Sequence, residues 1–149
     1  MAEYWIPFES AHAREIVSSN ARPQEVWCDA SYSDRWVKSL EDRLWAYTLM
    51  VDEKPVACVG LILQDFGKAE AWALFAKDFQ KHILNIYRII RAGLDMAFKK
   101  KNLMRIQATI DPSYPETIRW IESLGFEKEG CLRRFGPQGQ DFLMYSRLN

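Results

Sequence analysis

The chain has 149 residues, 48% of them hydrophobic, which is enough for one ordinary core and too few for two comfortable domains. Lys and Arg together number 20, as do Asp and Glu, so the chain lacks the summed positive field typical of nucleic-acid-binding proteins. These proportions predict a single domain over residues 1–149 that binds no nucleic acid.

The longest apolar runs, such as Pro55–Leu63, fall far short of the roughly 20 residues that a helix needs to span a bilayer. The opening "MAEYWIPFES" has no basic region followed by a long apolar one, so it is not typical of a signal peptide. Three widely separated cysteines indicate free thiols rather than a disulfide framework. The two histidines lie far apart, without a Cys or a second His at ligand spacing, so we predict no metal site. We expect a cytoplasmic protein that does not bind membranes.

The first third of the chain is rich in aromatic residues and has weak periodicity. "EYWIPF" is typical of a short strand, after which Ser10 is a candidate cap for a helix through "AHAREIVSS". Within the mixed stretch Trp27–Leu44, "SDRWVKSLEDR" favours a helix that begins after a Ser33 or Asp34 cap. Its tryptophans either pack in the core or form a partner surface, as aromatic side chains do at interfaces; they are Trp5, Trp27 and Trp36.

The pattern changes to strands at Leu44. Three apolar runs, "LWAYTLMV", "PVACVGLIL" and "AEAWALFA", are separated by the short polar segments "DEK" and "QDFGK". This spacing predicts a three-stranded antiparallel meander.

An amphipathic helix follows the meander. Its apolar residues recur at intervals of three, four and seven, namely Ile83, Ile86, Tyr87, Ile90, Leu94, Ala97 and Phe98. We expect Ile83, Ile86, Tyr87 and Ile90 to be buried, with Arg88 and Arg91 on the opposite, wetter face. The next segment, "LMRIQATI", alternates as a strand does. A strand, a long helix and a further strand predict a right-handed crossover between parallel strands.

The last quarter contains one more helix and a hairpin. Pro112 and Pro115 break the chain, and the helix Glu116–Leu124 ends where Gly125 can adopt the left-handed conformation without a Cβ penalty. The runs "EKEGCLRRF" and "DFLMYSRL" then flank "GPQGQ", which predicts a closing hairpin. Phe126 is expected to anchor the returning strand in the core.

This order of elements, with "IRWIESLGF" directly before the terminal hairpin, resembles the GNAT superfamily, the Gcn5-related N-acetyltransferases, over nearly the whole chain. The helix that ends on Leu-Gly-Phe is the most specific feature. The ending "GPQGQDFLMYSRL" resembles more narrowly the GNAT-like proteins of tailed bacteriophages, including the internal virion protein A group. The resemblance implies an α/β (α+β) fold with a mixed sheet of about six to seven strands. It also implies an antiparallel N-terminal meander, a parallel pair formed by the fourth and fifth strands, and helices on both faces.

In GNAT enzymes the thioester arm of coenzyme A enters a gap between the fourth and fifth strands. By position, its pantetheine would bond the backbone of Leu74, Phe75 and Ala76. The diphosphate usually occupies a glycine-rich turn at the start of the next helix, where amides and the helix dipole favour an anion.

The corresponding turn here reads "KDFQKHILNI" and contains no glycine. The resemblance therefore assigns Lys81, His82 and Ile83 to the phosphate site. Lys81 and His82 either replace the missing glycine amides with cationic side chains or form a solvated first helical turn.

Amine acetylation needs a base to deprotonate the ammonium and an acid for the leaving thiolate. Glu70 is the candidate base, because it lies four residues before the pantetheine segment, as the catalytic glutamate of the histone-acetylating branch does. The alternative is an exposed carboxylate after the turn at Gly67. Ile121 occupies the position of the usual tyrosine acid. Tyr114 and Tyr145 are candidate replacements, although Tyr145 is also explained as a packing residue.

Two hypotheses follow for the function. The first is an acyl-CoA-dependent N-acyltransferase that uses acetyl-CoA and acetylates an amine, on a host protein in the host cytoplasm if the chain is phage-encoded. The second is a catalytically degenerate GNAT-fold interaction or virion protein that binds a host or phage partner. Glu70 and the order of elements favour the first, whereas the glycine-free turn and Ile121 favour the second. The sequence identifies neither the acceptor nor the oligomeric state.

Overall fold

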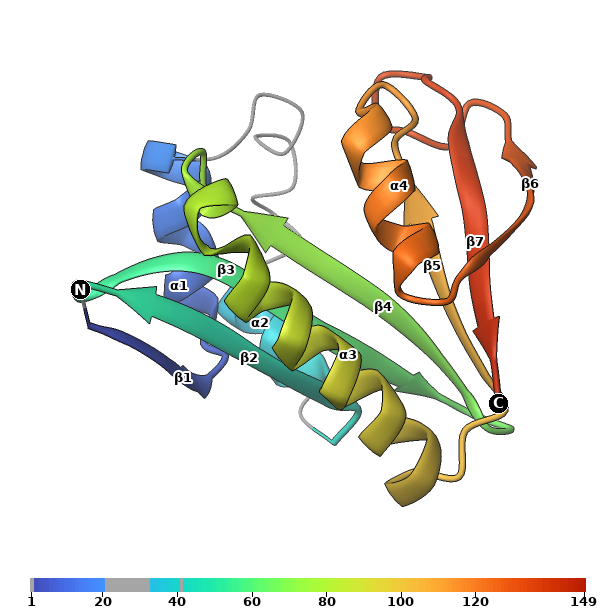
Figure 1. Cartoon of the computed structure of the whole chain (residues 1–149), viewed down its shortest axis with the longest axis horizontal. Helices are drawn as coiled ribbons and strands as arrows, with labels where there is room; N and C mark the ends of the chain where they lie inside the picture. The colour runs from blue at the N-terminus through green and yellow to red at the C-terminus, as the bar shows by residue number, and fades with distance from the viewer. Residues whose placement is uncertain (1, 21–32, 41) are drawn as a thin grey trace. The chain divides into compact units, whose positions relative to one another are not determined.

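The computed structural model describes residues 2–20, 33–40 and 42–149. Its elements, in chain order, are β1 (Glu3–Pro7), α1 (Ser10–Glu15), η1 (Ile16–Asn20), α2 (Asp34–Ser39), β2 (Leu44–Val51), β3 (Lys54–Gln64), β4 (Lys68–Phe75), η3 (Phe79–His82), α3 (Ile83–Lys100), β5 (Arg105–Ile110), α4 (Pro115–Ser123), β6 (Glu127–Leu132) and β7 (Phe142–Leu148). The seven strands form one sheet in the order β1-β2-β3-β4-β5-β7-β6 (Figure 1). The pair β4 and β5 is parallel, which confirms the predicted mixed sheet and its parallel pair. Within the described ranges, no helix is both long enough and apolar enough to cross a membrane.

The chain divides into two compact units. Unit 1 comprises Met1–Leu63 and Trp72–Ala92, and unit 2 comprises Gln64–Ala71 and Gly93–Asn149. The divisions fall inside β4 and inside α3, so each of these elements contributes residues to both units.

Side chains contribute to the N-termini of α1 and α2. The N-cap of α1 is Glu9 rather than the predicted Ser10: the Glu9 side chain accepts from the backbone of His12, and His12 Nδ1 accepts the Glu9 amide at 3.1 Å. Ser10 is instead the first helical residue, and its buried hydroxyl donates to Asp34. Ser33 caps α2 as predicted, because its hydroxyl accepts the Trp36 amide at 3.3 Å.

A compact apolar cluster joins α1 to the sheet in unit 1. Its fully buried members are Ala13, Ile16, Cys58, Leu74 and Ala76. Trp72 packs against this cluster, with the rings of Phe8 and Trp36 edge-on at 5.1 and 6.1 Å between centroids. Trp36 therefore belongs to the packing layer rather than to an exposed aromatic surface. Trp5 is half-buried and donates its indole N–H to Asn85 Oδ1 at 3.0 Å, whereas Trp27 lies outside the described residues.

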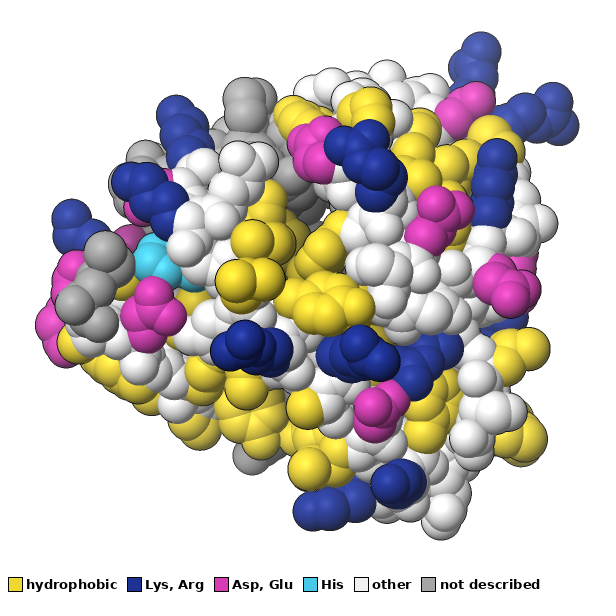
Figure 2. All heavy atoms as spheres, in the orientation of Figure 1, with side chains coloured by type: hydrophobic (Ala, Val, Ile, Leu, Met, Phe, Trp, Pro, Cys, Tyr) yellow, Lys and Arg dark blue, Asp and Glu magenta, His cyan; other side chains and the backbone are white. Residues whose placement is uncertain are grey.

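The amphipathic pattern of α3 has the predicted register. Ile86 is fully buried, Ile83, Tyr87 and Ile90 are half-buried, and Arg88 and Arg91 are exposed. Figure 2 shows basic side chains spaced among hydrophobic ones along this helix. Of the four side chains predicted to be buried, Ile86 is buried and the other three are half-buried. A helix that contacts its neighbours from one side leaves part of the adjoining side chains in solvent.

In unit 2, β5 alternates as predicted, with Ile106, Ala108 and Ile110 buried. β7 lies between β5 and β6 and pairs antiparallel with both, which completes the predicted terminal hairpin. The register of β6 shifts between Lys128 and Gly130.

The Leu-Gly-Phe segment ends α4 as the sequence predicts. Gly125 has φ of +91°, and its amide donates to the Glu122 carbonyl at 3.0 Å. The Phe126 amide donates to the Ile121 carbonyl at 3.3 Å, and the Phe126 side chain is 3% exposed. The left-handed glycine thus turns the chain so that Phe126 enters the core, where burying such a ring contributes about 1.5–3 kcal/mol.

An ion pair and a hydrogen bond link strands β5, β6 and β7 on the face of β5 opposite to its buried residues. The Arg105 guanidinium donates to both oxygens of Glu129, at 2.7 and 2.6 Å. The buried hydroxyl of Ser146 donates to Glu129 Oε2 at 2.6 Å. These hydrogen bonds, chiefly that from Arg105, lower the pKa of Glu129 to about 2.

We predict that Gly125→Ala lowers the free energy of unfolding by about 1–2 kcal/mol. The cost is conformational, because an added Cβ would meet only the Arg147 side chain, at an ordinary 3.5 Å. Urea denaturation measures the change. Gly130→Ala is the matched control, since that glycine has no positive φ and open space around it. An equal loss in both variants would show that the left-handed turn is not the cause.

We also predict that Glu129→Gln destabilises the protein in a pH-dependent way. The folded-state pKa of Glu129 is about 2, below the ordinary value of 4.5, so its contribution is present above the ordinary value and is lost as pH falls toward about 2. The difference in urea midpoint between wild type and variant should therefore be larger at about pH 6.5 than at about pH 3. Glu127→Gln, at an exposed position of the same strand, should show no such trend.

Candidate functional site

Glu70 lies near the start of β4, in the part of this strand that belongs to unit 2. Its parallel partner on β5 is Gln107, and the two side chains are hydrogen-bonded. The Glu70 carboxyl group is half-buried. Burial raises its pKa above the ordinary value, and the hydrogen bond from Gln107 opposes that rise. Glu70 is therefore neither the exposed carboxylate of the alternative interpretation nor a fully buried one.

Gln107 connects Glu70 to the ion pair described above. Arg105 donates its Nε–H to Gln107 Oε1 at 3.0 Å, while its two terminal nitrogens bind Glu129. A continuous polar chain thus runs from Glu70 through Gln107 and Arg105 to Glu129. The alternation of "RIQATI" already placed Arg105 and Gln107 on one face, but the pattern contains no signal for the register with Glu70.

Tyr145 lies on the opposite face of unit 2 from this polar chain. It is 2% exposed and follows the period of β7, in which the next residue, Ser146, contacts Glu129 on the Glu70 side. The Tyr145 hydroxyl donates to Glu122 of α4 at 3.4 Å. Burial, followed by the negative charge of Glu122, raises the pKa of Tyr145. The structure therefore does not bring Tyr145 and Glu70 together.

Tyr114, the other candidate acid, and Ile121, which occupies the position of the usual tyrosine, lie at the start of α4 and within it. Tyr114 is the N-cap residue of this helix; it is half-buried, and its carbonyl accepts the Thr117 amide at 3.0 Å. Ile121, at the position of the usual tyrosine, is 6% exposed and packs in the core. Among these positions, Tyr114 alone combines a phenol with partial exposure.

The end of β4 in unit 1 is closely packed. Leu74, Phe75 and Ala76 have side chains that are at most 5% exposed. The Ala76 amide donates to the Val56 carbonyl at 2.9 Å, and the Ala76 carbonyl accepts the Phe79 amide at 3.2 Å. The backbone of Ala76 is thus hydrogen-bonded within the chain on both sides.

A 3₁₀ turn, η3, replaces the glycine-rich turn. The Lys81 amide donates to the Asp78 carbonyl at 3.2 Å, and the amide of Ile83 donates to the Gln80 carbonyl. These amides stabilise the turn itself, whereas a glycine-rich turn presents its amides to a phosphate. Lys81 is exposed, so its ammonium group is available to an anion from solvent.

His82 is held in the interior of unit 1. Its side chain is 4% exposed, and Nδ1 lies 2.5 Å from Glu3 Oε1 of β1. Asn85 donates to the other Glu3 oxygen at 2.9 Å. Hydrogen bonds from Asn85 and His82 lower the pKa of Glu3, so this carboxylate stays ionised and keeps the imidazole engaged. Sequence reasoning missed Glu3, which lies 79 positions away along the chain.

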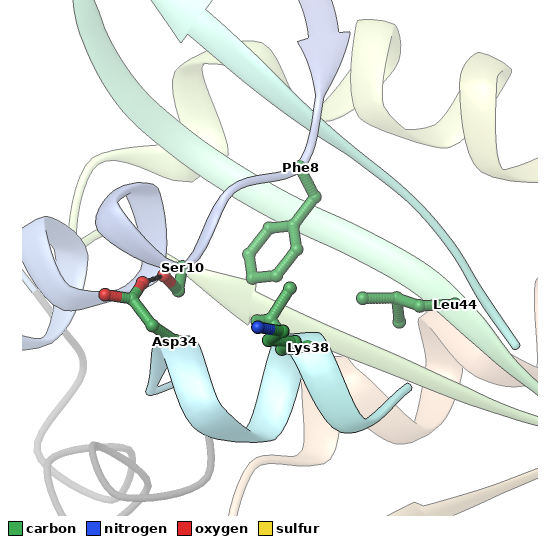
Figure 3. A pocket seen from close by; sticks show the side chains of 6 residues that line it. Phe8, Ser10, Asp34, Lys38 and Leu44 are labelled. Atoms are coloured by element: carbon green, nitrogen blue, oxygen red, sulfur yellow. Dashed lines mark hydrogen bonds between the residues drawn. The ribbon is translucent and has the colours of Figure 1, made fainter. Parts of the chain in front are cut away.

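Unit 1 also contains an open pocket of about 450 Å³ (Figure 3). Its lining residues are Phe8, Ser10, Asp34, Val37, Lys38 and Leu44. Arg14 donates to Asp34 at 3.0 Å, and Ser10 is hydrogen-bonded to both. Among the described residues that line the pocket, Asp34 is the acidic one, and its charge is balanced by Arg14. Across the described residues, no group of three or more His, Cys, Asp or Glu side chains could hold a metal ion.

No family model and no curated protein matches the sequence. Solved structures match its fold. A probable acetyltransferase from Staphylococcus epidermidis superposes with a TM-score of 0.80 at 15% identity, covering 99% of each chain. The ribosomal-protein-S18-alanine N-acetyltransferase of Escherichia coli gives 0.73 at 18% identity, over 99% of this chain and 94% of its own. An aminoglycoside acetyltransferase solved with ribostamycin and coenzyme A gives 0.67 at 16% identity, over 100% and 94%.

These similarities extend over the full sheet. Because the sequence identities are so low, they establish the fold alone. They agree with the seven-stranded mixed sheet and its parallel pair β4 and β5. The chain therefore has the fold of the GNAT N-acetyltransferases.

Proposed function

We propose that the chain is an acyl-CoA-dependent N-acyltransferase that transfers the acetyl group of acetyl-CoA to an amine, with residues 1–149 acting as one domain. The observation that carries the proposal is the half-buried Glu70 carboxyl group on the fourth strand of an acetyltransferase fold. Burial raises its pKa, which brings its basicity closer to that needed to take a proton from an ammonium group near neutral pH.

In the proposed reaction Glu70 accepts a proton from the substrate ammonium. The free amine then attacks the thioester carbonyl carbon, the new C–N bond forms, and the C–S bond breaks to release the thiolate of coenzyme A. Tyr114 or solvent supplies the proton that the thiolate takes up. Tyr145 is the weaker candidate for this acid, because its raised pKa and its contact with Glu122 disfavour proton donation.

Cofactor binding in this proposal depends on unit 1. The backbone of Leu74, Phe75 and Ala76 would bond the pantetheine. The amide and the carbonyl of Ala76 already have hydrogen-bond partners within the chain. Lys81 would attract the phosphates from η3, next to His82 and just before Ile83 begins α3. The imidazole of His82 is buried and held by Glu3, so it would not contact the phosphates directly. Its contribution would be to hold the start of α3 in place.

The acceptor in this proposal is an amine on a protein. The argument for a phage-type protein is the ending "GPQGQDFLMYSRL". A phage origin would make the acceptor a host protein in the host cytoplasm.

A second candidate is a GNAT-fold interaction or virion protein without transfer chemistry. Two observations favour it: the amides of Lys81 and Ile83 donate to carbonyls of the η3 turn itself, and His82 is engaged by Glu3. Both reduce the chain's capacity to hold a diphosphate. Direct binding of acetyl-CoA decides between the candidates.

We predict that acetyl-CoA binds weakly and with marked salt dependence. A side-chain ammonium group is screened over a Debye length of about 8–10 Å, whereas a backbone cradle is less sensitive to salt. Calorimetry should show an affinity that falls as salt rises and falls about two- to fivefold in Lys81→Ala. Lys100→Ala, at the other end of α3, is the matched control and should bind like wild type. No binding at about millimolar ligand and low salt would leave only the interaction protein.

We further predict that Glu70→Gln lowers the acetylation rate by about 100-fold at moderate pH. The deficit should shrink as pH rises, because the free amine then accumulates without a base. Rates measured across a pH series with one amine acceptor test this. Glu127→Gln removes a carboxylate from an exposed position and should leave the profile unchanged. A wild-type profile in Glu70→Gln would remove Glu70 from the base role.

A further inference from the structure

Gln107 is hydrogen-bonded to Glu70, and Arg105 constrains the orientation of the Gln107 side chain. A primary amide has an acceptor oxygen on one side and a donor NH₂ group on the other. Arg105 Nε–H can only donate, so at 3.0 Å it requires the oxygen of Gln107 to face it. The NH₂ group must then face away from Arg105. Because an ionised carboxylate only accepts hydrogen bonds, this orientation suits Glu70.

Arg105 is itself held by Glu129, through the terminal nitrogens of its guanidinium group. Glu129 accepts from both terminal nitrogens of its guanidinium, and Ser146 donates to Glu129 from a nearly fully buried hydroxyl. A guanidinium bound at two points keeps its plane, and therefore the direction of its Nε–H, fixed. Side chains of β6 and β7 thus determine which group of the Gln107 amide faces Glu70 on β4.

We infer that Gln107 is a positioning residue for Glu70, locked by the Arg105–Glu129 pair so that its NH₂ group donates to the Glu70 carboxylate. This inference rests on the proposed role of Glu70 as the base. It assigns the network a purpose beyond joining strands: the hydrogen bond favours the ionised carboxylate against the effect of burial, and it holds the carboxylate in one orientation.

A test must separate two effects of Arg105 on Glu70: the direct effect of its charge and its positioning effect through Gln107. Lys68 on the same strand is exposed, Arg105 on β5 is cationic, and Glu129 on β6 is anionic but paired with Arg105. A direct charge effect of Arg105 on Glu70 would depend only on the presence of a cation. The positioning effect depends on the Nε–H and on the fixed plane of the guanidinium.

Two variants separate these effects. Gln107→Met keeps the length of the side chain and removes the donor. Arg105→Lys keeps the positive charge and removes both the Nε–H and the two-point grip of Glu129. Thr109→Val is the matched control, because Thr109 lies half-buried on the same face of β5 and takes no part in the polar chain.

The readout is the titration of Glu70 followed by carbon-detected NMR of its side-chain carboxyl, which needs no activity. Circular dichroism and urea midpoints confirm that each variant is folded. Loss of the amide donor should raise the titration midpoint of Glu70 by about one pH unit in Gln107→Met. Arg105→Lys should raise it in the same direction, and Thr109→Val should leave it unchanged. Unchanged midpoints in both Gln107→Met and Arg105→Lys would overturn the inference, as would a rise in Gln107→Met alone.

Rate measurements separate this inference from the proposed function. If Glu70 is the base, the acid limb of the pH–rate profile should shift to higher pH in Gln107→Met, as the NMR titration midpoint does. A shifted midpoint with an unshifted acid limb supports the positioning role and removes Glu70 as the base. Shifted rates with an unshifted midpoint would overturn the positioning role.

Discussion

The hydrogen bonds that join the start of β4 to β5 are the constraint on which the proposed chemistry depends. The Gly67 carbonyl accepts the amides of Met104 and Arg105 at 2.7 and 3.2 Å, and the parallel register continues to the pair Glu70 and Gln107. A glycine suits this turn, since φ is +72° and an added Cβ would lie 3.3 Å from the Asn102 carbonyl oxygen. A register shift of one residue would turn Glu70 to the other face of the strand and break the polar chain to Glu129.

The candidate cofactor positions and the candidate proton-transfer positions belong to different units. Leu74–Ala76 and Lys81 are in unit 1, whereas the candidate base Glu70, the candidate acid Tyr114 and the positioning residue Gln107 are in unit 2. Substitutions in unit 1 should therefore act mainly on affinity, and those in unit 2 mainly on rate and its pH dependence. The glycine-free turn does not by itself decide against catalysis, because the network around Glu70 does not depend on η3.

Patterns local in sequence predicted most of the fold. The stripe of α3, the alternation of β5 and the left-handed Gly125 each depend on residues within one or two turns, where period and backbone sterics decide the outcome. Contacts between distant residues could not be predicted in this way. His82 is engaged by Glu3 from another strand, and Gln107 meets Glu70 only through the sheet register. The sequence therefore identified Glu70 as a candidate base but not Gln107, the side chain that is hydrogen-bonded to it.

The irregular register of β6 affects how the sheet meets other molecules. β6 is the last strand of the sheet, and its first three residues, Glu127, Lys128 and Glu129, are charged and exposed. The shift between Lys128 and Gly130 interrupts the even row of amides and carbonyls that an incoming strand would need. At the opposite end of the strand order, β1 has only five residues and ends at Pro7. Both borders thus resist extension of the sheet by a foreign strand, the mode of association called β-augmentation.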